Sequence, residues 1–159
     1  MDLKSIDVRT QKYISERRNP TVTQVMTGLI SLGSVPLNLI LLFFIYQLGT
    51  FQQFKELLIT LILTWTLVHF LKKFYSRERP ENQVIDPSFA SSFPSGHSAT
   101  GFASSILLST FFPGLATVFV LLALTVSFSR IYLGEHFFTD ALAGSLLGLF
   151  TALIVTIIL

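Results

Sequence analysis

The sequence lacks cysteine and is poor in charged residues. The chain can therefore form no disulfide bond and no thiolate metal site. Without cysteine, the sequence does not indicate whether the protein lies in an oxidising or a reducing compartment. Asp, Glu, Lys and Arg make up 13% of its 159 residues, compared with about 25% in a typical soluble domain. The formal net charge of +2 is too small to indicate a nucleic-acid partner.

Apolar residues are correspondingly frequent in the sequence. Hydrophobic residues form 51% of the chain, and phenylalanine alone occurs 16 times. This composition is typical of a membrane protein. The length fits one domain, 1–159, with a sizeable core. No cleavable signal peptide is expected, because residues 1–19 are polar and the first apolar stretch is too long for a signal-peptide core.

The charged residues fall into clusters, separated by runs without Asp, Glu, Lys or Arg. A helix needs about 20 apolar residues to cross a bilayer. The uncharged runs are 19–54, 57–71, 87–129 and 141–159. They predict an all-α integral membrane helical bundle in which the polar segment 1–20 forms an amphipathic helix on the membrane. The predicted spans, five in all, lie near 22–48, 52–73, 97–112, 114–132 and 137–159.

The first predicted span is unusual in length. The segment 22–48 is long for one span and short for two. Gly33-Ser34 and Pro36 are expected to break or kink it. Whether it forms one kinked span, or a span plus a re-entrant piece, stays open at this point.

The run 87–129 predicts a helical hairpin, because a Pro-Gly turn signal stands in its middle at 113–114. The hairpin begins at His97 and returns to Arg130, so both residues lie on one face of the membrane. The charged end of the second span and the start of the last helix reach the same face. Ionisable groups at membrane depth are costly and usually functional. We therefore expect a functional site there, formed by charge clusters that are far apart in sequence.

His136 and Asp140 are spaced for cooperation on one helix. Residues at i and i+4 lie on the same helix face, one turn apart. An aspartate that accepts a hydrogen bond from one imidazole nitrogen fixes the tautomer of the ring. The other nitrogen is then free to act as a nucleophile.

The remaining candidates suit a phosphate group. Lys72, Arg79 and Arg130 supply fixed positive charge, with the arginine fork matched to phosphate oxygens. The segment 95–97, Ser-Gly-His, opens a helix, so its unpaired backbone N–H groups point at an arriving anion. Its glycine permits close approach, and His97 can protonate a leaving oxygen. These residues together suit phosphoryl transfer through a phosphohistidine, without any metal.

Three segments carry a family resemblance. They are "KKFYSRERP" at 72–80, "PSGH" at 94–97 and "SRIYLGEHFFTD" at 129–140. All three are complete, in order and correctly spaced, and they are similar to the three signature motifs of the type 2 phosphatidic acid phosphatase family. The membrane enzymes of that family share their site design with vanadium haloperoxidases. The family's membrane phosphatases usually have six spans, one more than we count here.

The resemblance implies a role for each matched residue. His136 would be the nucleophile, His97 the general acid and Asp140 the orienting carboxylate. The phosphate would be bound by Lys72, Arg79, Ser95, Gly96 and Arg130. No cofactor and no metal ion is implied, and the partners are a lipid phosphate substrate and the bilayer. The sequence does not indicate an oligomeric state.

The leading hypothesis is an integral membrane phosphatase acting on a lipid phosphate monoester or lipid diphosphate. The candidate substrates are phosphatidylglycerol phosphate, undecaprenyl diphosphate, phosphatidic acid and lipid A phosphates. A phosphotransferase with the same residues is the main alternative, and a non-catalytic membrane scaffold or transporter is a weaker one. A vanadate-dependent oxidase is disfavoured, because those relatives are soluble and larger.

The expected location is the cytoplasmic (inner) membrane of a bacterium or archaeon, with the site on the extracytoplasmic face, as the family usually has it. The positive-inside rule points the other way. It does so because five basic residues of the N-terminal segment would then lie outside: Lys4, Arg9, Lys12, Arg17 and Arg18.

Several other residues allow an ordinary interpretation. Lys73 and Arg77 are as readily membrane-surface anchors as site residues. His69 fits a helix-packing contact better than a catalyst. Glu135 fits a solvated loop charge, with substrate contact as the alternative. The glycines at 144 and 148 predict close helix packing without chemistry.

Overall fold

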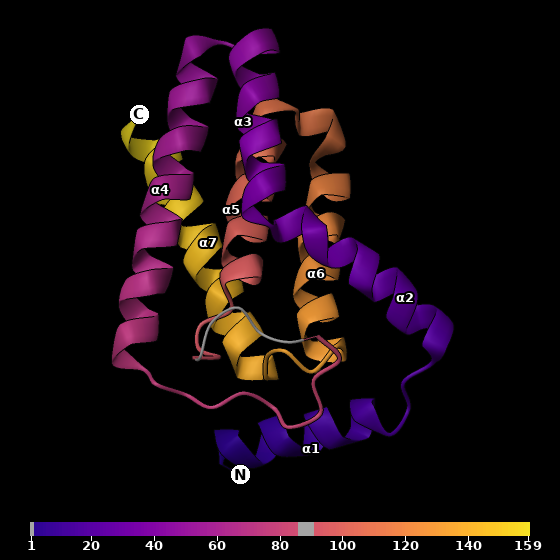
Figure 1. The fold of residues 1–159 in the computed structure, drawn as a ribbon. Coiled ribbons are helices and arrows are strands. Elements are labelled where there is room, and N and C mark those ends of the chain that lie inside the picture. Colours follow the sequence, from indigo (N-terminus) through magenta and orange to yellow (C-terminus); the bar gives the residue numbers. More distant parts are fainter. Residues whose placement is uncertain (1, 86–90) are drawn as a thin grey trace.

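The computed structural model describes residues 2–85 and 91–159, and every regular element in them is a helix (Figure 1). Asp86, which the sequence adds to the charge cluster after residue 72, lies outside the described residues. The elements are α1 (Leu3–Ser15), α2 (Pro20–Leu29), the short 3₁₀ helix η1 (Ile30–Gly33), α3 (Val35–Leu48), α4 (Phe51–Phe74), α5 (Gly96–Phe111), the 3₁₀ helix η2 (Pro113–Leu115), α6 (Ala116–Tyr132) and α7 (Phe138–Ile158).

The first apolar segment is broken where the sequence predicts a break. Helices α2 and η1 meet α3 at an angle of 51°. Ser34 interrupts the helix with extended backbone, and the proline of α3 follows in its first turn. A proline there costs no hydrogen bond, because the first N–H groups of a helix have no partner inside it. The predicted kink is therefore confirmed.

Side chains satisfy N–H groups at the starts of α4, α5 and α7. Thr50 and Gln53 form a reciprocal capping box at the start of α4. Ser95 caps α5 through its side chain, which accepts from the N–H of Ser98. Asp140 accepts from the N–H of Phe137 at 2.9 Å, at the start of α7. Two of these capping side chains, Ser95 and Asp140, belong to the predicted site.

Helices α5 and α7 pack with their backbones almost in contact. A β-carbon at Gly148 would lie 2.0 Å from the carbonyl oxygen of Ala99, and one at Gly144 would lie 2.3 Å from that of Ser95. Only glycine permits such an approach. The predicted close packing at these two glycines is confirmed, and it draws the start of α7 against the start of α5.

The helices are long and apolar enough for a membrane protein. In residues 2–85 and 91–159, three helical segments are long and apolar enough to cross a membrane: Phe51–Phe74, Pro113–Tyr132 and Phe138–Ile158. If the bent pair Pro20–Gly33 and Val35–Leu48 is counted as one span, these residues contain four candidate spans. Helix α5, with 16 residues, is shorter than these segments, so five spans remain a prediction. The hairpin of α5 and α6 is present, with its turn at Pro113–Leu115 as the sequence indicates.

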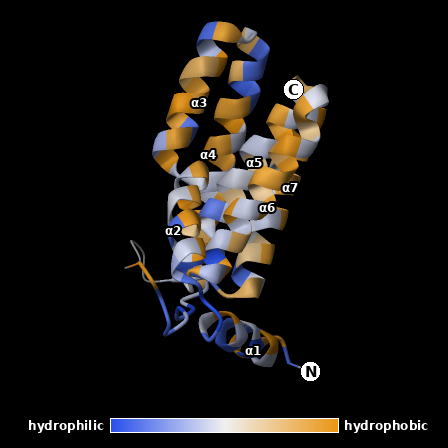
Figure 2. Ribbon diagram, turned by 90° about the vertical axis from the view of Figure 1, so that its right-hand side faces the viewer, coloured by the Kyte–Doolittle hydropathy of each residue, from blue (hydrophilic) through white to orange (hydrophobic). Residues whose placement is uncertain are grey.

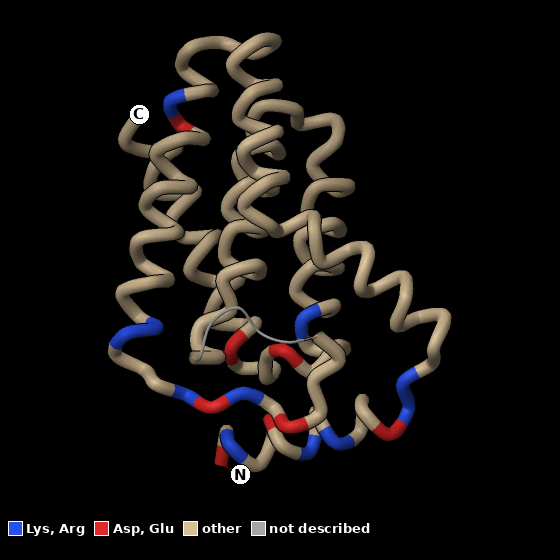
Figure 3. Tube along the Cα trace, viewed as in Figure 1, with Lys and Arg blue, Asp and Glu red and all other residues tan. Residues whose placement is uncertain are grey.

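The two ends of the bundle differ in polarity. Lys, Arg, Asp and Glu gather at the end where α1 lies across the bundle, and one further pair stands near the start of α4 (Figure 3). The upper parts of the helices are predominantly apolar (Figure 2). Large apolar side chains point outward there, among them Phe43, Ile62, Leu121, Phe150 and Ile154. The N-terminus lies at the charged end and the C-terminus near the opposite end (Figure 1).

Candidate active site

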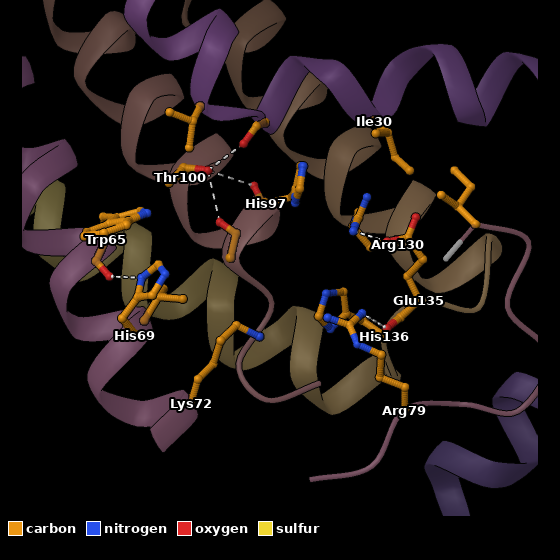
Figure 4. A pocket seen from close by; sticks show the side chains of 15 residues that line it. Ile30, Trp65, His69, Lys72, Arg79, His97, Thr100, Arg130, Glu135 and His136 are labelled. Atoms are coloured by element: carbon orange, nitrogen blue, oxygen red, sulfur yellow. Dashed lines mark hydrogen bonds and ion pairs between the residues drawn. The ribbon is translucent and has the colours of Figure 1, made fainter. Parts of the chain in front are cut away.

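A cavity of about 270 Å³ opens at the charged end of the bundle. Its walls come from α4, α5, α6 and η1, and from the segments that follow α4 and α6. Of the predicted site residues, six line it: Lys72, Arg79, Gly96, His97, Arg130 and His136 (Figure 4). The fold therefore brings the three motifs together around one space. Ser95 and Asp140 stand behind this wall, and both are fully buried.

Three cations reach the cavity from three different elements. Lys72 stands in the last turn of α4, and its Nζ donates to the carbonyl oxygen of Ser91 at 2.7 Å. Arg79 lies in the segment after α4, and its Nη1 donates to the carbonyl oxygen of Glu135 at 2.7 Å. Arg130 stands in the last turn of α6 and is buried. Such a cluster of positive charge at the end of an apolar bundle favours the binding of an anion.

Glu135 corrects the sequence-based interpretation. The ordinary hypothesis makes it a solvated loop charge, but the side chain is buried and lines the cavity. Its carboxylate forms an ion pair with Arg130. Burial raises the pKa of Glu135, while the positive charges of Arg130 and Arg79 oppose that rise. Glu135 thus holds Arg130 in place, and it leaves positive charge in excess around the cavity.

His97 and Gly96 form the first turn of α5 at the cavity wall. The turn is fixed from behind, because Thr100 donates from its hydroxyl to the carbonyl oxygens of Gly33 at 2.8 Å and Gly96 at 3.0 Å. Ser95 uses its hydroxyl as the cap of α5, and its N–H donates to the carbonyl oxygen of Asp140 at 3.0 Å. Its predicted contact with phosphate stays a prediction.

His136 and Asp140 face each other, but His136 lies in the loop just before α7 and not on the helix that their spacing predicts. Nδ1 of His136 is 3.8 Å from Oδ2 of Asp140, with both side chains buried. This is longer than a hydrogen bond, and Nδ1 has no hydrogen-bond partner among the described residues. Catalytic hydrogen bonds are often long without substrate and shorten when it binds. The Nδ1 edge of the ring faces Asp140, which leaves Nε2 as the nitrogen available for chemistry.

Burial and charge keep the ring of His136 neutral. Burial lowers its pKa to about 4, opposed by the carboxylate of Asp140 and reinforced by the charges of Arg130, Arg79 and Lys72. A neutral imidazole has a lone pair to donate at neutral pH. The same cations that suit a phosphate group thus also keep this ring unprotonated.

Sequence reasoning left the role of Arg77 open and missed that of Asp7. Arg77 donates from Nη1 to Oδ1 of Asp140 and from Nη2 to Oδ2 of Asp7, both at 2.6 Å. It is therefore more than a membrane-surface anchor. Asp7 is 1% exposed although it lies in the polar N-terminal helix. A buried aspartate in such a helix has no local pattern that marks it, since its partners lie 70 and 132 residues away.

His69 also lines the cavity, beside Trp65 of the same helix. Its Nδ1 lies 2.8 Å from the carbonyl oxygen of Trp65, and the two rings are 3.9 Å apart between centroids. The contact with Trp65 agrees with a role in packing within α4. In residues 2–85 and 91–159, no three or more His, Cys, Asp or Glu side chains are grouped to hold a metal ion.

Comparison with known proteins identifies the family. Residues 53–159 match the model of the PAP2 superfamily, which covers two thirds of the chain. The chain therefore belongs to the PAP2 superfamily. It is 32% identical over 163 aligned residues to phosphatidylglycerophosphatase B of Bacillus subtilis (strain 168), covering 92% of this chain and 80% of that protein. A lipid A 1-phosphatase of Rhizobium johnstonii is 28% identical over 64% of this chain and 46% of its own length.

Solved structures agree with this assignment. The crystal structure of Aquifex aeolicus LpxE superposes with a TM-score of 0.87 at 28% identity, covering 95% of this chain and 94% of that one. The PAP2-type phosphatidylglycerolphosphate phosphatase of Bacillus subtilis superposes with a TM-score of 0.84 at 29% identity, covering 97% and 84%. The resemblance seen in the three sequence motifs is thus confirmed at the level of the family and of the fold.

Proposed function

We propose that the protein is an integral membrane phosphatase that hydrolyses a lipid phosphate monoester or a lipid diphosphate through a phosphohistidine intermediate. One observation carries the proposal: Lys72, Arg79 and Arg130 line a single cavity together with the imidazoles of His97 and His136, at the charged end of an apolar helical bundle. A site at the membrane surface suits a substrate whose tail stays in the bilayer. The relatives, named as lipid phosphatases, support the same class of reaction.

The first half of the reaction is carried by His136. Its Nε2 attacks phosphorus, while the bond from phosphorus to the lipid oxygen breaks on the opposite side. Asp140 faces Nδ1 and stabilises the positive charge that the ring acquires as it is phosphorylated. Lys72, Arg79 and Arg130 bind the oxygens of the phosphoryl group and neutralise charge that spreads over them in the transition state.

His97 serves as the acid and then as the base. It donates a proton to the leaving lipid oxygen in the first half, so that a neutral alcohol departs from a monoester. In the second half it accepts a proton from the water that attacks the phosphohistidine. Inorganic phosphate and the free His136 ring are the products, and each proton donated by His97 is returned to it. This division of roles needs only residues of this chain.

The identity of the lipid stays open within one chemical class. The phosphatidylglycerophosphatase of Bacillus subtilis and the lipid A 1-phosphatase suggest a glycerophospholipid phosphate and a glycolipid phosphate as the first substrates to test. Undecaprenyl diphosphate and phosphatidic acid complete the set. We further propose that the charged end of the bundle faces the extracytoplasmic side of a cytoplasmic membrane, with the N-terminus on that side.

The test is release of inorganic phosphate by the purified protein from each of these four lipids in mixed micelles. We expect release from at least one of them without any added acceptor lipid. His136→Ala is the matched control for contaminating phosphatases and should release none. Consumption of substrate without phosphate release, unless a second lipid is added, would instead identify a phosphotransferase. No reaction with any lipid would refute the proposed function.

A further inference from the structure

The N-terminal helix α1 contacts the start of α7, which begins two residues after His136. Asp7 of α1 accepts two hydrogen bonds from Thr139, one from its N–H at 3.0 Å and one from its hydroxyl at 2.5 Å. The first N–H groups of a helix have no partner within it. Asp7 therefore caps α7 from a different helix, 132 residues away in sequence. It also lies outside the residues 53–159 that match the family model.

Arg77 joins this cap to the candidate active site. Its guanidinium bridges two buried carboxylates, Asp7 and Asp140, at 2.6 Å each. Nη1 also donates to the hydroxyl of Thr139 at 2.7 Å, and the guanidinium carbon lies 4.5 Å from the centre of the Phe137 ring. The planar guanidinium binds both carboxylates, so it holds each of them in one orientation and offsets their negative charge.

The bridge determines which oxygen of Asp140 faces His136. Oδ1 of Asp140 is bound by Arg77, and Oδ2 accepts from the N–H of Phe137 at 2.9 Å. Oδ2 is also the oxygen 3.8 Å from Nδ1 of His136. With both oxygens held, the carboxylate cannot rotate away from the imidazole. Without Arg77, Oδ1 would lose its charged partner in a buried environment.

Arg18, which follows α1 in the N-terminal segment, contacts the other end of the loop that carries His136. Arg18 donates from Nε to the carbonyl oxygen of Tyr132 at 2.8 Å and from Nη1 to that of Asn82 at 2.7 Å. Gly134 of this loop has a φ of +77°, and a β-carbon at this position would come within 2.6 Å of Arg18. The α6–α7 loop is thus held at both ends by residues from the N-terminal segment.

We propose that Asp7 and Arg77 are positioning residues of the catalytic site, and that α1 acts through them to orient Asp140 and His136. The inference rests on the proposed function for its effect on rate. The geometric claim concerns His136 alone and can be tested without activity. A purely structural role, in which the same bridge only anchors α1 to the bundle, is the alternative that the experiment must exclude.

The variants are Asp7→Asn, Arg77→Gln and Arg77→Lys, with Glu16→Gln as the matched control. Glu16 is a carboxylate near the end of α1 whose side chain is 55% exposed and forms ion pairs with the exposed Lys12 and Arg17. Asp7→Asn and Arg77→Gln should lower kcat about tenfold to a hundredfold, with KM changed less than about threefold. Arg77→Lys should recover part of the loss, because it restores charge without the fork. The double variant should cost little more than either single one.

Histidine NMR supplies the readout that does not depend on turnover. The chain has three histidines, so His136 is assigned by comparison with His136→Ala. We expect the ¹⁵N signals of the His136 ring to change in Asp7→Asn and Arg77→Gln, and to stay unchanged in Glu16→Gln. Unchanged His136 signals in both variants would overturn the proposal, whatever happens to kcat. A lowered Tm with unchanged kcat would also overturn it, since α1 would then be only an anchor. If the wild-type protein releases no phosphate, the proposed function fails, and the NMR comparison still decides the positioning.

Discussion

Oδ2 of Asp140 lies 3.8 Å from Nδ1 of His136, and both side chains are buried. The pair stands at the start of α7, where the apolar bundle meets its charged end. Around it, cations from α4, from the segment after α4 and from α6 line the same cavity.

The two histidines should differ in how their loss depends on the leaving group. For a lipid phosphate, His97→Ala should cost about 10²–10⁴-fold in kcat, the usual contribution of a general acid. An aryl phosphate with an acidic phenol departs without protonation, so the same variant should cost clearly less with that substrate. His136→Ala should abolish nearly all activity with both. Equal dependence on the leaving group in the two variants would contradict this division of roles.

The rate should stay high to an unusually acidic pH before it falls. His136 must be neutral to attack, and burial lowers its pKa to about 4. The acid limb that belongs to this group should therefore pass through pH of about 4 in a profile of kcat/KM, compared with about 6.5 for an unperturbed histidine. Glu56→Gln, at the opposite end of the bundle, should leave this limb where it is. An acid limb of His136 near pH 6.5 would be inconsistent with the buried, cation-surrounded ring.

Activity should survive removal of divalent metal ions. Lys72, Arg79 and Arg130 line the cavity and can supply the positive charge that a metal-dependent phosphatase takes from metal ions. Turnover should be unchanged in EDTA, and vanadate should inhibit because it mimics pentacoordinate phosphorus. Complete loss in EDTA, with rescue by one particular divalent ion, would rule out this mechanism.

The absence of cysteine permits a clean test of membrane orientation. Ser5→Cys lies in α1 at the charged end, and Leu48→Cys lies at the end of α3, where the native side chain is 82% exposed. If the charged end faces the extracytoplasmic side, an impermeant thiol reagent should label Ser5→Cys in intact cells and Leu48→Cys only after lysis. The reverse pattern would show that the site faces the cytoplasm.

Much of the fold could be predicted because its signals are local. The break at Ser34 and the turn at Pro113–Leu115 follow from proline and glycine, which restrict or free the backbone wherever they stand. The close packing at Gly144 and Gly148 follows from their spacing on one helix face. The count of spans was harder to predict, because the 16 residues of α5 lie between a full span and a shorter buried helix.

The residues of the candidate site likewise fall into those that local sequence patterns identify and those that they do not. Its motif residues could be located because their chemistry depends on short, fixed spacings, as for His136 and Asp140. The burial of Glu135 and the bridge from Asp7 through Arg77 could not. Each depends on which segments the fold brings together, and a charged residue in a polar stretch looks the same whether it is solvated or buried. Only tertiary contacts separate the two cases.

Trapping the phosphorylated enzyme identifies the residue that attacks phosphorus. The purified protein is mixed briefly with a ³²P-labelled lipid phosphate, quenched in alkali, where phosphohistidine persists, and the labelled peptide is mapped. We expect label on the peptide that contains His136 and no label in His136→Ala. In a variant in which only hydrolysis of the phosphohistidine is slowed, the label should persist for longer. Label that maps to His97, or phosphate release by His136→Ala at the wild-type rate, would contradict the proposed role of His136.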